Sequence, residues 1–229
     1  MRERAARQWR VLVVAAVLPA LSGLAQDGAP LAQGRVRRGY VDGRFGQMHY
    51  RQVVPEPSAQ NLTPLVLFHP TALSSDYFKL FLPEIGRDRR ATAIDTPGYG
   101  ESDPPPEPQP IEALAAAMAD ALDAFGFGPG GAGQGDLMGI HTGSLLAGEL
   151  AVQRPDLVRR VILSGVPLFL GEERAARYEQ LIEPYKSLDP ADHSHIMRFW
   201  RDTVEKRQPA LSVERAAEHA YDQYRSGQR

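Results

Sequence analysis

The stretch "LMGIHTGSLLAG", residues 137–148, decides how this sequence folds. Its first residues suit the end of a buried strand, and its later residues suit a helix. Gly139 and Gly143 stand on either side of His141 and leave room for a sharp turn between the two elements. Such a turn would place His141 between the end of the strand and the start of the helix. The stretch therefore predicts an imidazole at the end of a strand, where it could act on a ligand.

The segments around this turn alternate between apolar strands and helices. Strands that alternate with helices of this length require a parallel sheet covered on both faces, so the expected fold class is α/β. We expect core strands at 64–68, 91–95, 135–139 and 158–164, helices over 76–86, 111–127 and 144–154, a surface strand within 46–57, and Val66, Ile94 and Ile162 in the core.

Composition divides the chain into three parts. Residues 1–25 join an arginine-rich start to a largely apolar run of 15 residues, as in a secretory signal peptide. A membrane anchor would need about 20 apolar residues, whereas Pro19 and Ser22 interrupt this run, so no stable span is expected after cleavage. Residues 39–170 are expected to form the core, and residues 171–229 a helical cap. The predicted location is the periplasm or the exterior of the cell.

Charge and cysteine content exclude several classes of function. The chain has 26 lysines and arginines against 28 aspartates and glutamates, and no basic block that would neutralise a run of phosphates. Nucleic acid is therefore not an expected partner. The absence of cysteine excludes disulfides and a thiol nucleophile. A small molecule is the expected substrate or ligand, and the oligomeric state is left open.

Four segments in this order resemble the α/β-hydrolase superfamily over about residues 39–170. "FHPTALSS" (68–75) stands at the family's oxyanion loop, "DTPGYGESDPP" (95–105) at the loop after the next strand, "GIHTG" (139–143) at the nucleophile elbow and "RPDLVRRVILSG" (154–165) at the approach to the sixth strand. The resemblance implies a mostly parallel central sheet with helices on both faces and a helical cap toward the C-terminus.

The resemblance also implies roles for residues near the turn. By family position, the backbone N–H groups of Thr71 and Thr142 would form the oxyanion hole, and Gly139 and Gly143 would be the elbow glycines. Pro70 stands where the family usually has glycine. Because proline has no N–H, it supplies no donor to the hole itself.

His141 occupies the position of the family's serine nucleophile. A neutral imidazole could attack an activated acyl group or act as a general base, and the helix N-terminus would favour the neutral form. The resemblance further implies an acid and a second histidine after later strands. The chain ends at Arg229 within cap-like helices, and residues 164–167 after the sixth strand carry no carboxylate. The sequence therefore resembles a C-terminally truncated member of the superfamily.

Neither a cofactor nor a metal ion is predicted. The segment "GPGGAG" (128–133) has the glycine spacing of a dinucleotide fingerprint but precedes a strand instead of following one, so we interpret it as a flexible loop. His193 and His195 lie two apart in a predicted helix and point to different faces, which argues against a joint metal site.

Three hydroxyl or carboxyl side chains near the glycine-rich turns are interpreted as structural. Ser102 or Asp103 is expected to fix the turn after the second core strand, and Ser144 is expected to cap the helix that follows His141.

Two hypotheses about function remain. In the first, the protein hydrolyses a small ester, amide or related acyl substrate with His141 at the nucleophile position. In the second, it is a catalytically impaired or truncated pseudo-enzyme that binds a small apolar ligand or a protein partner. The resemblance leans toward an enzyme, but the chain lacks a recognisable serine nucleophile and the later acid and histidine.

Overall fold

The computed structural model describes residues 12–13, 35–57, 62–169, 171–181, 192 and 194–226. Within these residues the strands form one seven-stranded mixed sheet. Its members are β1 (Leu12–Val13), β2 (Arg37–Gly43), β3 (Gly46–Val53), β4 (Leu65–Phe68), β5 (Ala91–Ile94), β6 (Gly135–Ile140) and β7 (Val158–Ser164).

The sheet runs in the order β1-β7-β6-β4-β5-β3-β2. The four predicted core strands, β4 to β7, are parallel neighbours, which confirms that part of the prediction. The strand expected at the surface, β3, instead lies between β2 and β5 and is antiparallel to both. That prediction was wrong for Met48 and His49, which are buried in the strand.

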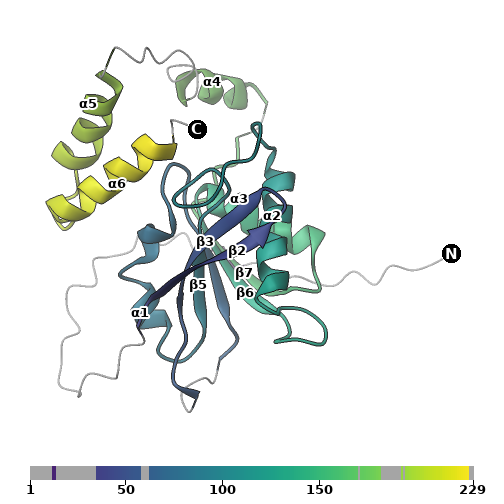
Figure 1. Cartoon of the computed structure of the whole chain (residues 1–229). Coiled ribbons are helices and arrows are strands. Elements are labelled where there is room, and N and C mark those ends of the chain that lie inside the picture. The colour runs from purple at the N-terminus through teal and green to yellow at the C-terminus, as the bar shows by residue number, and fades with distance from the viewer. Residues whose placement is uncertain are drawn as a thin grey trace.

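Helices cover both faces of the sheet and also gather at one end of the molecule (Figure 1). The predicted helix over 76–86 is two short pieces, because Pro83 begins a new helical turn after Phe81. The helices are η2 (Ser75–Phe78, a 3₁₀-helix), α1 (Leu82–Ile85), α2 (Ile111–Ala124), α3 (Thr142–Gln153), α4 (Glu172–Leu181), α5 (Ser194–Trp200), η4 (Arg201–Glu205, a π-helix) and α6 (Val213–Ser226). Among the described residues, none of these helices is long and apolar enough to cross a membrane.

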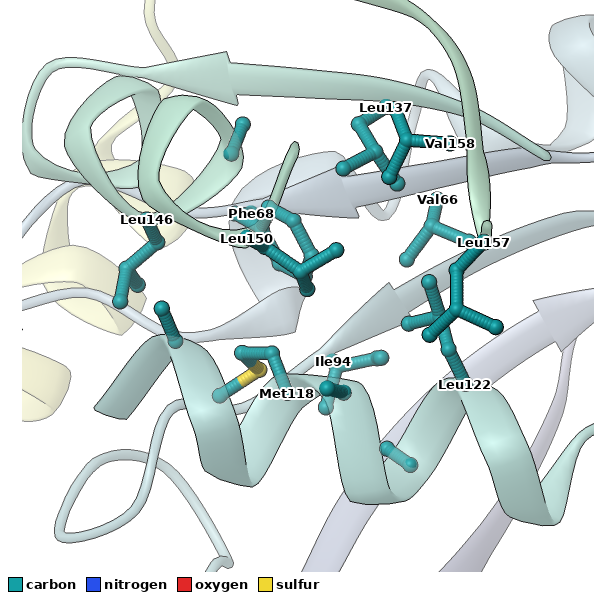
Figure 2. Packing of buried hydrophobic residues seen from close by; sticks show 14 of the residues in the cluster. Val66, Phe68, Ile94, Met118, Leu122, Leu137, Leu146, Leu150, Leu157 and Val158 are labelled. Atoms are coloured by element: carbon teal, nitrogen blue, oxygen red, sulfur yellow. The ribbon is translucent and has the colours of Figure 1, made fainter. Parts of the chain in front are cut away.

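The parallel strands contribute side chains to two hydrophobic cores, one on each face of the sheet, because successive side chains of a strand point to opposite faces. Val66 and Phe68 of β4 point to the face covered by α2 and α3, where Figure 2 shows them packed with Met118 and Leu150. Leu65 and Leu67 point to the opposite face, toward η2 and α1. The predicted burial of Val66 and Ile94 is confirmed, since both are fully buried.

Ile162 was also predicted to be in the core, but it is only half-buried. It lies in β7, whose outer neighbour β1 has two residues, Leu12 and Val13. A strand with so short a neighbour keeps partial exposure of its side chains. Leu12 and Val13 belong to the predicted signal peptide, and the other residues of that segment lie outside the described part of the chain.

α6 docks on the core chiefly through polar side chains. Lys79 pairs with Glu218 at 2.8 Å, Glu101 pairs with Arg225 at 2.5 Å, and Ser74 donates a hydrogen bond to Asp222 at 2.5 Å. Asp76 of η2 also pairs with Arg215. The apolar residues of α6 pack elsewhere, in a separate cluster of Val204, Ala216 and Ala220.

We expect salt to weaken this docking, because raising NaCl from about 0.1 M to about 1 M shortens the Debye length from about 10 Å to about 3 Å. Amide hydrogen exchange in α6 should then become about fivefold faster, in line with the modest strength of exposed ion pairs. The measurement is hydrogen exchange by mass spectrometry at both salt concentrations, with α2 as the internal control. Unchanged protection of α6 would contradict docking through charges.

Candidate active site

The chain turns sharply at His141, between the end of β6 and the start of α3. His141 has φ 53° and ψ −121°, a backbone conformation that L-residues rarely adopt. Its backbone N–H donates to Ser164 O at 2.8 Å, and its carbonyl accepts from Ser144 N at 2.8 Å. Its side chain is exposed. The prediction of a tight turn that presents this imidazole at the carboxyl ends of the parallel strands is confirmed.

The two flanking glycines are required by close approach of the backbone. A Cβ on Gly139 would lie 2.0 Å from Gly143 O, and a Cβ on Gly143 would lie 2.2 Å from Phe68 O. These contacts are with backbone atoms, which cannot rotate away as a side chain could. With glycine at both positions, β6, α3 and the end of β4 pack closer together than a residue with a Cβ would allow.

The loop after β4 reaches the turn through Thr71. Its backbone N–H donates to Thr142 Oγ1 at 2.5 Å, and the two threonine hydroxyls are also 2.5 Å apart. The next residue, Ala72, has φ 67°. Among the described residues, Ala72 and His141 are the two non-glycine residues with positive φ, and both lie at this site. Backbone strain in such positions commonly accompanies a functional site.

His69 fixes this loop to the neighbouring one. Its Nε2 accepts from the Thr96 backbone N–H at 3.0 Å, so the ring proton is on Nδ1, which donates to Pro70 O at 2.9 Å. Burial lowers the pKa of His69 and keeps it neutral. Burial raises the pKa of Tyr99, and an interaction with the Thr71 side chain opposes that rise.

Asp95, at the end of β5, is the most strongly held carboxylate next to the site. It lies 2.8 Å from Nδ1 of the buried His49 and accepts from the backbone N–H groups of Ser75 and Glu101. Burial raises the pKa of Asp95, but the hydrogen bond with His49 and the backbone donors outweigh burial and lower it to about 2. The sequence analysis missed this residue, although a carboxylate directly after a buried strand was the available signal.

Two of the three predicted structural roles near the turns are confirmed. The Ser102 hydroxyl donates to Asp95 O at 2.8 Å, and Asp103 accepts from Gln47 N at 2.8 Å. Ser144 does not cap α3, as was predicted. Its hydroxyl donates to Gly139 O at 2.7 Å, because the side chain points inward to the strand end instead of back over the helix N-terminus.

The segment 128–133 forms a closed loop, with the Gly128 N–H donating to Gly133 O at 2.9 Å. It precedes β6, as the sequence indicated. His193 lies outside the described residues, and no group of three or more potential metal ligands occurs in the described part of the chain.

A pocket of about 330 Å³ lies along the loop that follows β5. It is lined by Tyr99, by prolines of the segment 104–108 and by Leu114. Tyr99 is among the lining residues, whereas Thr71, Thr142 and His141 are not. Its size is near the lower end of the range for small-molecule sites. A second pocket, of about 170 Å³, lies between α6 and the Asp95 loop.

Comparison with known proteins agrees with this geometry. The family model described as alpha/beta hydrolase fold matches residues 63–207, more than half of the chain. The chain belongs to the alpha/beta hydrolase fold family. No curated protein matches it significantly.

Solved structures similar in fold to this chain come from proteins with different names and activities. Cfl2 from Burkholderia cenocepacia matches with a TM-score of 0.64 at 18% identity, over 85% of this chain and 69% of that one. Epoxide hydrolase VrEH1 from Vigna radiata matches with a TM-score of 0.61 at 17% identity, over 84% and 68%. Naproxen esterase from Bacillus subtilis matches with a TM-score of 0.58 at 19% identity, over 85% and 61%. At such identities the likeness shows the fold.

The site of this α/β-hydrolase differs from a serine triad in one further respect. Among the described residues, no carboxylate and no second imidazole hydrogen-bonds to the His141 side chain. The buried His49–Asp95 pair has the composition of a base and its orienting acid, but its Nδ1–Oδ2 contact joins β3 to β5 inside the sheet. The described residues thus bring together the elbow, Thr71 and Thr142, and leave His141 without a base.

Proposed function

We propose that this α/β-hydrolase cleaves small, activated acyl esters, with His141 as the nucleophile. One observation carries the proposal: the strained turn presents an exposed imidazole at the N-terminal end of α3. The first N–H groups of a helix lack partners within it and attract negative charge. An acyl oxygen that became negative during attack by His141 would face that helix end.

The reaction needs no group beyond the imidazole and water. An unprotonated ring nitrogen of His141 attacks the acyl carbon, and the alkoxide or phenolate leaves with the bonding electrons; the resulting acyl-imidazolium loses its remaining ring proton to water and becomes an acyl-imidazole. Water then attacks the acyl carbon, and the imidazole leaves as the carboxylic acid forms. Because no general acid among the described residues contacts His141, the proposed reaction requires a leaving group that departs as a stable anion.

The pocket beside Tyr99 supports a small substrate. Its volume of about 330 Å³ and its proline-rich wall suit a short apolar acyl or aryl group. The structural relatives named as an esterase, an epoxide hydrolase and an N-acyl homoserine lactonase act through hydrolysis, which supports hydrolysis as the class of reaction.

The test compares the unmodified chain with His141→Ala and His141→Ser on p-nitrophenyl acetate. We expect slow turnover by the unmodified chain and at least about a tenfold lower rate in His141→Ala. His141→Ser should not restore strong activity, since the serine would lack its base. Hydroxylamine should trap an acetyl group from the unmodified chain alone. Equal rates in the unmodified chain and His141→Ala would exclude His141 as the nucleophile.

A second function is favoured by a different observation. The N–H group of Thr71 is already bonded to Thr142 Oγ1, so the expected oxyanion donor is occupied within the protein. This supports a non-catalytic relative that binds a small apolar ligand in the pocket beside Tyr99. Binding of p-nitrophenol that is unaffected by His141→Ala, together with absence of turnover, would support this second function.

A further inference from the structure

The hydroxyl of Thr142 accepts from the backbone N–H of Thr71, the group that family position assigns to the oxyanion hole. Thr142 Oγ1 is 2.5 Å from Thr71 N and 2.5 Å from Thr71 Oγ1, so two polar groups of one residue converge on it. A donor of an oxyanion hole is expected about 2.7–3.1 Å from the oxygen that it stabilises. An N–H group with an acceptor already at bonding distance along its axis has no second strong bond to offer.

The local backbone explains why these two residues meet. Pro70 has no N–H, so Thr71 supplies the first donor of the loop after β4. The positive φ of Ala72 turns the loop, and the strained His141 starts α3 at Thr142. The contact therefore joins two loops that the fold fixes in place.

We propose that Thr142 is an internal competitor for the oxyanion hole, which restricts the site to ligands whose oxygen can displace its hydroxyl. The consequence of this competition for catalysis rests on the proposed function. Its effect on ligand binding does not depend on His141. Ligands with a carboxylate or phosphonate oxygen compete best, because bonds to charged acceptors are stronger than the neutral bond that they replace.

Displacement needs only rotation of the threonine side chain about χ1. Thr142 is partly exposed at the first position of α3, so its hydroxyl can move to solvent when a ligand enters. The cost of the displacement is the lost hydrogen bond, which corresponds to about a three- to tenfold loss of affinity. Removing the hydroxyl should therefore raise the affinity by the same factor of about three to ten.

The experiment measures binding of butylphosphonate by titration calorimetry to the unmodified chain, Thr142→Ala and Thr142→Ser. Thr142→Ala removes the acceptor and should bind about three- to tenfold more tightly. Thr142→Ser keeps the hydroxyl and should bind as the unmodified chain does. Alanine suits a helix start position as well as threonine does in propensity, and a thermal melt checks that both variants fold.

The same titrations in a His141→Ala background separate this inference from the proposed function. The gain in butylphosphonate affinity from Thr142→Ala should persist in the His141→Ala background, because it depends on the Thr71 N–H and not on the imidazole. A gain in affinity in both backgrounds, together with no esterase activity in the unmodified chain, would leave the competitor role intact and refute His141 as the nucleophile. Equal or weaker binding by Thr142→Ala in both backgrounds would overturn the competitor role.

An NMR measurement gives a second, direct readout. The Thr71 amide proton should shift upfield in Thr142→Ala, because it loses a short hydrogen bond, and move back downfield when butylphosphonate is added. In the unmodified chain the same proton should move little, since one acceptor replaces another. If butylphosphonate does not change the chemical shift of the Thr71 amide proton in Thr142→Ala, Thr71 is not the donor to the ligand.

Discussion

Gly139→Ala is expected to destabilise the protein by about 3 kcal/mol or more. The added Cβ would lie 2.0 Å from Gly143 O and 2.5 Å from Ser144 N. Both atoms belong to the first turn of α3, and relieving the contact means moving the helix away from β6. Urea denaturation, followed by circular dichroism, gives the change in free energy of unfolding.

Gly148→Ala is the matched control, because it makes the same chemical change in α3, the helix that the Gly139 Cβ would displace. A Cβ on Gly148 meets no atom within 4 Å. Alanine favours a helix interior over glycine by about 0.8–1.0 kcal/mol, so this variant should be slightly more stable than the unmodified chain. A Gly139→Ala protein as stable as Gly148→Ala would show that the turn is not packed as the structure has it.

The sequence predicted the centre of the sheet because each core strand is a short apolar run followed by a turn signal. It did not predict β2, Arg37–Gly43, in which Tyr40 and Val41 are the apolar residues and no residue is fully buried. That strand is held by seven paired residues of β3 instead of by burial. Strands whose stability comes from a partner leave little trace in the local sequence pattern.

The sequence predicted which backbone positions form the site, but it did not predict which side chains there are in contact. Glycine spacing located His141, and family position located Thr71 and Thr142. The bond between those threonines joins residues 71 positions apart, and its geometry depends on a rotamer. Asp95 was missed for a similar reason, since its partners His49 and Ser75 lie 46 and 20 residues away.

Asp95→Asn is expected to destabilise the protein by about 3–5 kcal/mol, because it breaks a buried charged network. The carboxylate accepts from His49, from Ser75 N and from Glu101 N. An asparagine has one acceptor oxygen in place of two, and its NH₂ group would face a donor. Asp88→Asn is the control, since Asp88 is an exposed carboxylate and its loss should change stability by at most about 0.5 kcal/mol.

The pH dependence of stability gives Asp95 a second signature. Its pKa is lowered from 3.8 to about 2 in the folded protein, so folding favours the ionised form. The resulting stabilisation, about 2 kcal/mol, is present above pH 4 and is lost as the pH falls toward 2. Urea unfolding between pH 6 and pH 2.5 should therefore show a steeper loss of stability in the unmodified chain and in Asp88→Asn than in Asp95→Asn. Parallel curves for all three proteins would mean that the Asp95 carboxylate is not held as the structure has it.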